Sequence, residues 1–215
     1  MTLLMLSDIL IVIASLIGLF LLSKINKIYA LFIYYLLAGL ITELSYYTHF
    51  NGSIKKIIIF IYAIAATQLL LSLFFSWDKN KFTLKTKILF HVIFSLIVLA
   101  DVFSFYFYGI NTKWGTLLIY LALSVYSINI LNQHTVGFYS KKSTISRALI
   151  IVPFVVFSIY YVTISIVMYF LYNASNQKFF ESLYNLILVI NILAYISFSF
   201  ALILAPKKDQ FLIVT

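Results

Sequence analysis

The chain lacks cysteine and is poor in charge, glycine and proline. Of its 215 residues none is Cys, two are Pro, six are Gly, and only 10% are charged. Without cysteine the chain has no disulfide, no thiolate metal site and no cysteine nucleophile. A chain that is 64% hydrophobic has too little polar surface to cover a soluble domain of this size. The composition therefore predicts an integral membrane protein.

Seven long apolar runs occupy most of the chain. A helix needs about 20 apolar residues to cross the hydrocarbon core, and no segment between the runs is long and polar enough to form a soluble domain. We therefore predict an all-α, polytopic seven-transmembrane-helix bundle, with residues 1–215 as a single transmembrane domain and the first run as a retained helix. The runs are Leu3–Leu22, Ile28–Tyr47, Ile57–Trp77, Ile88–Tyr108, Thr116–Leu131, Ala148–Tyr172 and Leu183–Ala205.

The basic residues lie mainly in the connections on one side of the membrane. Eleven of the 15 Lys and Arg residues follow the first, third, fifth and seventh runs, and four lie on the other side. The positive-inside rule then places the N-terminus outside and the C-terminus in the cytoplasm. Because orientation explains the basic residues, we expect no nucleic-acid partner. We also expect all 15 to lie outside the spans.

Acidic side chains inside the runs are the main functional candidates. Glu43 lies within the apolar stretch Leu36–Tyr47, Asp101 lies in the fourth run, and Asp8 lies in the first. An acid in a membrane-spanning helix is costly and by default marks a functional site. In the predicted orientation all three lie toward the outer leaflet, so they are expected to line a single outward-facing cavity.

Polar residues at helical spacing extend this candidate site. Tyr46 and Tyr47 follow Glu43 within about one turn of helix. Asn191 shares one face of the last run with Tyr184 and Tyr195. The alternative for the tyrosines and serines is that they only join helices by hydrogen bonds. The predicted ligand-binding residues are Glu43, Asp101, Tyr46, Tyr47 and Asn191.

Several chemistries are not expected. His49 falls at the outer end of the second run, whereas His91 and His134 fall at inner ends, about a membrane thickness away. One zinc ion cannot be held by all three at bonds of about 2 Å, and each is read as an interfacial histidine. The last run has no lysine for a retinal Schiff base, and no hydrolase, zinc-protease or phosphate-loop motif occurs. We therefore expect no metal and no cofactor.

Short motifs recur along the chain, at Ile41–Leu44, Tyr62, Leu69–Ser72, Pro153–Phe154, Asn191–Leu193 and Lys207–Lys208. Together they resemble a group of uncharacterised bacterial seven-helix inner-membrane proteins of about this length. The resemblance implies a compact seven-helix bundle, a multi-pass location in the inner membrane and a sensory or signalling role with a partner protein. Members often carry a second acid in the third span, where this chain has Thr67 and Gln68.

Three functions fit these observations. The first is a protein that senses or binds a small ligand or lipid through an outer-leaflet cavity and signals through a partner protein. The second is an intramembrane lipid-modifying enzyme in which Glu43 and Asp101 act as acid and base. The third is a cation or proton pathway that uses the same acids. The sequence leaves open whether any catalysis occurs.

The charge asymmetry generates a topology prediction. A reporter that is active only in the cytoplasm should be active when fused to the C-terminus, and a reporter that is active only outside should be silent there. The opposite result would place Glu43 and Asp101 in the inner leaflet and would overturn the outward-facing cavity.

Overall fold

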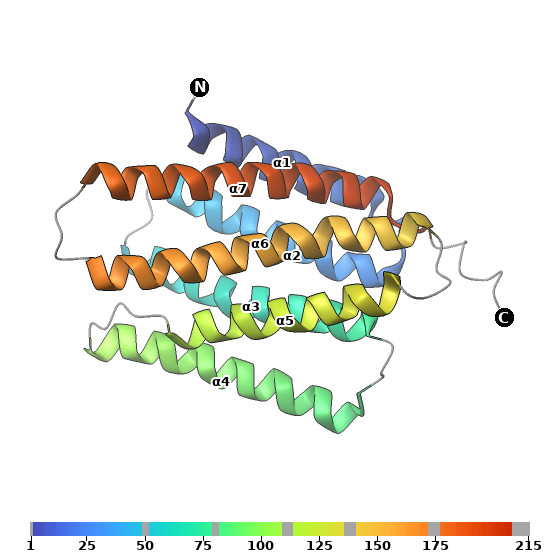
Figure 1. The fold of residues 1–215 in the computed structure, drawn as a ribbon, viewed down its shortest axis with the longest axis horizontal. Coiled ribbons are helices and arrows are strands. Elements are labelled where there is room, and N and C mark those ends of the chain that lie inside the picture. Colours follow the sequence, from blue (N-terminus) through green and yellow to red (C-terminus); the bar gives the residue numbers. More distant parts are fainter. Residues whose placement is uncertain are drawn as a thin grey trace.

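The computed structural model describes residues 2–48, 52–78, 82–108, 114–135, 141–171 and 177–207. All regular structure in these ranges is helical, apart from one isolated bridge between Ile25 and Lys207. The helices run roughly parallel to the long axis of the bundle (Figure 1). They are α1 (Leu3–Leu21), α2 (Lys27–Tyr47), α3 (Gly52–Trp77), α4 (Leu84–Tyr108), α5 (Trp114–Thr135), α6 (Lys141–Leu171) and α7 (Gln177–Ile203).

All seven helices are long and apolar enough to cross a membrane, as the sequence predicts. Several helix ends extend beyond the apolar runs: α6 starts at Lys141 instead of Ala148, and α5 continues to Thr135 instead of Leu131. An apolar run marks only the stretch that suits hydrocarbon, whereas backbone hydrogen bonds continue a helix into polar sequence. As a result Arg147 lies inside α6, one residue before the apolar run that starts at Ala148. That every basic residue lies outside the membrane-spanning stretches stays a prediction.

The helices form two layers. The helices α1, α2 and α3 lie behind α7, α6, α5 and α4 (Figure 1), and neighbours within each layer pack against each other. Contacts of α1 with α7, and of α3 with α4 and α5, join the layers. The helix α4 lies at the edge of the bundle. Its principal contacts are with α3 and α5.

The turn between α1 and α2 is tied to the end of α7. The side chain of Asn26 caps α2 by accepting a hydrogen bond from the Ile28 amide at 2.9 Å. The backbone amide of Asn26 donates to the Pro206 carbonyl at 3.0 Å. These bonds satisfy groups that a helix end leaves without an internal partner.

Large apolar side chains lie on both the inside and the outside of the bundle. The core includes Phe32, Ile33, Leu36 and Phe74, which are at most 1% exposed. Many other large apolar side chains, Phe20 at 79% among them, lie on the outer surface. A soluble monomer rarely exposes so much contiguous apolar surface, so this surface suits lipid contact and the protein is a multi-pass membrane protein.

Small residues on α1 allow it to pack closely. The buried face of α1 includes Ala14, Ser15 and Gly18. A Cβ atom placed on Gly18 would lie 3.0 Å from Cγ2 of Ile33 on α2. Small residues at such crossings let helix backbones approach, which is how membrane helices gain packing energy.

The close approach at Gly18 predicts a position-specific loss of stability. Gly18→Leu should lower stability by about 1–3 kcal/mol, because a side chain there overlaps Ile33. Gly52→Leu is the matched control, since a Cβ at Gly52 meets nothing within 4 Å. Thermal unfolding in detergent would compare them, and equal midpoints would contradict the packing described here.

Candidate functional site

Two acids from different helices lie together at the predicted outer end of the bundle. Asp8 of α1 accepts a hydrogen bond from the Tyr47 hydroxyl of α2. Glu43, half-buried and one turn before Tyr47, interacts electrostatically with Asp8. Neither carboxyl has an ion pair with a basic side chain in the described part of the chain. Like charges repel, so a cation bound between the two carboxylates would be favourable.

Hydrogen bonds within α2 hold the last turn that carries these groups. The side chains of Thr42, Ser45 and Thr48 donate to backbone carbonyls three or four residues earlier, at 2.6–3.0 Å. The Lys55 ammonium donates to the Tyr46 carbonyl at 3.3 Å. These donors satisfy carbonyls near the carboxyl end of α2, so Lys55 helps to close the helix end and makes no ion pair with Glu43.

Exposed tyrosine rings surround the two acids. Tyr46, Tyr47 and Tyr184 are 54%, 62% and 53% exposed, and Tyr46 interacts electrostatically with both Glu43 and Tyr184 of α7. We call Asp8, Glu43, Tyr46, Tyr47 and Tyr184 the acid–tyrosine cluster. Carboxylates near exposed tyrosine side chains suit a ligand that carries an ammonium group.

The other two predicted ligand-binding residues are placed differently. Asp101 lies on α4, at the edge of the bundle, and Glu43 has Asp8 as its acidic neighbour, so the structure does not bring Glu43 and Asp101 together. Asn191 is half-buried on α7, and no hydrogen bond of its side chain occurs within the described ranges. Its role in ligand binding stays a prediction.

Asp101 caps α5. Its carboxylate accepts hydrogen bonds from the Gly115 amide at 3.1 Å, the Thr116 amide at 2.5 Å and the Thr116 hydroxyl at 2.7 Å. These amides belong to the first turn of α5, where the helix dipole also favours negative charge. A Cβ at Gly115 would lie 2.5 Å from Cγ2 of Ile97, so glycine is needed for this approach. Asp101 therefore has a structural partner that Glu43 lacks.

Tyrosine hydroxyls continue from the acids into the middle of the bundle. Tyr195 interacts electrostatically with Glu43 and Asp8, and Tyr62 interacts with Tyr195 and with the Tyr35 hydroxyl. Tyr120 and Tyr161 add to the group, with ring centroids 5.9 Å apart. We call Tyr35, Tyr62, Tyr120, Tyr161 and Tyr195 the central tyrosines.

A layer of phenylalanines lies on the side of the central tyrosines that faces away from Asp8 and Glu43. Phe32 packs edge-on against Phe198 at 5.0 Å, and Phe74 against Phe154 at 5.5 Å between ring centroids. All four are buried, at 6% exposure or less. These rings fill the interior with apolar groups at that depth.

Arg147 and His134 form a buried polar cluster beyond this layer, which the sequence reading missed. Nε2 of His134 lies 2.7 Å from the Trp77 carbonyl, and Nη1 of Arg147 lies 2.6 Å from Nδ1 and 2.8 Å from Nε2 of His134. A carbonyl only accepts, so Nε2 donates to it, and the neutral ring can then accept from Arg147 at Nδ1. The guanidinium also lies over the Trp77 ring, 5.8 Å from its centroid. Tyr29 of α2 faces this cluster.

A signal for this cluster is present in the sequence. Arg147 precedes Phe154 and Tyr161 by seven and fourteen residues, so all three share one face of α6. His134 is 3% exposed and therefore buried in the bundle, one residue before the end of α5 at Thr135. Trp77 ends α3 as predicted, but it is 2% exposed and faces the interior.

His91 lies apart from His134. It bonds to Gln68 on α3, whereas His134 bonds to Arg147, and His49 lies outside the described residues. Within the described ranges, no group of three His, Asp or Glu side chains is arranged to hold a metal ion. That the three histidines do not share an ion stays a prediction.

Comparison of the chain with protein-family models, with curated proteins and with solved structures finds no match.

The cap on α5 generates a graded stability prediction. Asp101→Ala should destabilise the protein by about 0.5–2 kcal/mol, the usual value of a lost helix cap. Asp101→Asn should cost less, because one carbonyl oxygen remains to accept from an amide. Thermal unfolding in detergent measures the loss, and hydrogen exchange should speed up at Gly115 and Thr116. An Ala variant as stable as the parent would show that the cap is dispensable.

Proposed function

We propose that this protein binds a small ligand or lipid head group that carries an ammonium group, and that the acid–tyrosine cluster forms the binding site. The observation that carries the proposal is the approach of Asp8 and Glu43, from two helices, without a basic partner among the described residues. An acid in a span is costly and by default marks a functional site. A bound cation would relieve the repulsion between the two carboxylates.

The tyrosines favour an organic cation over a metal ion. Three exposed rings adjoin the acids, and aromatic faces attract ammonium groups at distances of about 6 Å. The carboxylates supply the opposite charge. Primary amines and larger ammonium groups share this chemistry, whether they belong to a soluble molecule or to a lipid head group.

The interior favours binding over conduction. On each of four helices a phenylalanine separates a central tyrosine from the predicted inner end of the helix. On α2, Phe32 lies between Tyr29 at the inner end and the central Tyr35. On α6, Phe154 lies between Arg147 at the inner end and the central Tyr161. Phe74 and Phe198 complete this layer. An ion in a layer of buried rings has no polar group to replace its water. A cation pathway would have to open this layer.

We further propose that ligand binding is signalled to a partner protein, in an inner membrane with the N-terminus outside. The connections between the helices are short, the longest lying between Trp77 and Leu84, so the signal has to leave through the ends or outer faces of the helices. Asp8 on α1 and Glu43 on α2 belong to different helices, so a ligand between them would bias how α1 and α2 pack.

Binding of two probes to purified protein in detergent tests the site. Ethanolamine represents a soluble amine, and short-chain phosphatidylethanolamine represents a lipid head group. Binding of ethanolamine indicates a soluble ligand, and binding of the lipid alone indicates a lipid. Binding of neither would overturn the proposal.

Substitutions at Glu43 separate a functional role from a structural one. Glu43→Gln should fold normally and bind the probe at least tenfold more weakly, because the amide keeps the shape of the acid without its charge. Glu43→Leu should leave stability unchanged or raise it, since the cost of burying a polar group disappears. Glu181→Gln, an exposed acid on α7 outside the cluster, is the matched control and should bind normally. A Gln variant with full binding, beside a Leu variant that fails to fold, would show that Glu43 only joins helices.

A further inference from the structure

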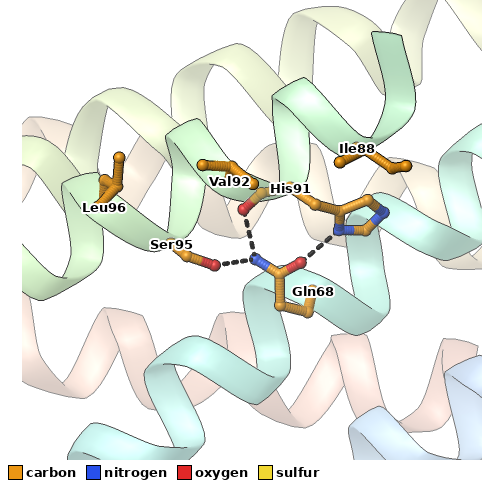
Figure 2. A pocket seen from close by; sticks show the side chains of 6 residues that line it. All are labelled: Gln68, Ile88, His91, Val92, Ser95 and Leu96. Carbon is orange, nitrogen blue, oxygen red and sulfur yellow. Dashed lines mark hydrogen bonds between the residues drawn. The ribbon is translucent and has the colours of Figure 1, made fainter. Parts of the chain in front are cut away.

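A groove between α3 and α4 opens on the outer surface of the bundle. It has a volume of about 320 Å³ and is lined by Gln68 of α3 and by Ile88, His91, Val92, Ser95 and Leu96 of α4 (Figure 2). Ile88, Val92 and Leu96 are 53%, 50% and 58% exposed. The groove thus faces what would be lipid, and it is separate from the acid–tyrosine cluster.

The polar groups of the groove lie within the apolar runs. His91 and Ser95 are three and seven residues after the start of the apolar run at Ile88, and Gln68 is nine residues before the end of α3 at Trp77. At a rise of about 1.5 Å per residue Ser95 and Gln68 are about 10 Å or more from these limits, and His91 is about 5 Å from its own. Water is scarce at that depth, so each polar atom needs a partner in the protein or in a ligand.

The hydrogen bonds of Gln68 determine which nitrogen of His91 carries a proton. The Gln68 amide nitrogen donates to the Ser95 hydroxyl at 2.8 Å and to the His91 backbone carbonyl at 3.2 Å (Figure 2). The reversed amide would place its oxygen against that carbonyl oxygen, so the orientation is fixed. The Gln68 oxygen then faces Nδ1 of His91, and because an oxygen only accepts, Nδ1 must carry the proton.

A neutral His91 ring therefore presents a bare lone pair at Nε2. In Figure 2 the second ring nitrogen points away from Gln68. No described group donates to this atom, and it is not among the fully buried polar atoms, so a ligand in the groove can reach it. The Phe75 ring packs against the imidazole at 5.8 Å between centroids, which together with Gln68 fixes the direction of the lone pair.

We propose that this groove binds a neutral lipid alcohol, that is, a membrane-dissolved molecule with an apolar body and a free hydroxyl group that donates to Nε2 of His91. The apolar side chains Ile88, Val92 and Leu96 contact the body, and the lining carries no Lys, Arg, Asp or Glu to pair with a charged head group. The volume suits a small molecule, whereas a helix of a second copy is about 10 Å wide.

A matched pair of probes tests the hydroxyl directly. Dodecanol and its methyl ether share an apolar chain, but only the alcohol donates a hydrogen bond. Binding to purified protein in an amine-oxide detergent, which has no hydroxyl group, can be followed by native mass spectrometry. We expect the alcohol to bind at least tenfold more tightly than the ether. Histidine ¹⁵N NMR should show Nε2 of His91 accepting a hydrogen bond only with the alcohol. Equal binding of the two probes would overturn the proposal.

Variants locate the binding site on the protein. His91→Phe keeps a ring against Phe75 but removes the acceptor, and should reduce binding of dodecanol to the level of the ether. Val92→Trp should block the groove, whereas Leu99→Trp, on an exposed part of α4 outside the groove, should bind normally. If His91→Phe fails to fold, the two Trp variants decide the matter. Unchanged binding in Val92→Trp, or a dimer that this substitution dissociates, would overturn the proposal, since a dimer would make the groove an interface between copies.

Discussion

The need to satisfy every polar group without water shapes the whole protein. In hydrocarbon an unpaired backbone N–H or C=O is costly, so each crossing segment has to be a helix that bonds to itself. Side chains meet the same requirement through other helices. Asp101 accepts hydrogen bonds from the first amides of α5. His134 is hydrogen-bonded to Arg147 and to the Trp77 carbonyl at the end of α3. These cross-helix bonds position the helices, while close packing such as that at Gly18 draws them together.

The interior that results has polar ends and an apolar layer between them. Acids and tyrosines lie at the predicted outer end, buried phenylalanines follow, and Arg147 and His134 lie at the predicted inner end. The separation places Asp8 and Glu43 on the side of the aromatic layer opposite the buried Arg147, whereas the buried Asp78, next to Trp77, lies at the same end as Arg147. A ligand at the acids therefore meets little competition from the protein's own buried cation, and this supports the proposal that the site binds an ammonium group.

Three acids that look alike in the sequence differ because of their neighbours. Asp101, Glu43 and Asp8 each lie in an apolar run. Asp101 meets a helix amino end, which supplies donors and a favourable dipole. Glu43 and Asp8 meet each other and tyrosines. The amino end of α5 compensates the charge of Asp101, whereas no donor of that kind compensates Asp8 and Glu43. For this reason the candidate site contains Asp8 in place of Asp101.

The sequence by itself determined the number and approximate limits of the helices, because a run of about 20 apolar residues has few other uses. It also made Glu43, Tyr46 and Tyr47 candidate site residues, since an acid in such a run is conspicuous. Only the tertiary structure decided that Asp8 joins Glu43, that Asp101 caps α5 and that Arg147 is buried. The physical reason is that these helices are apolar toward both lipid and interior, so the contrast between faces that reveals the buried side of a soluble helix is weak. The rotation of each helix, and therefore the partners of its few polar residues, depends on how the helices pack.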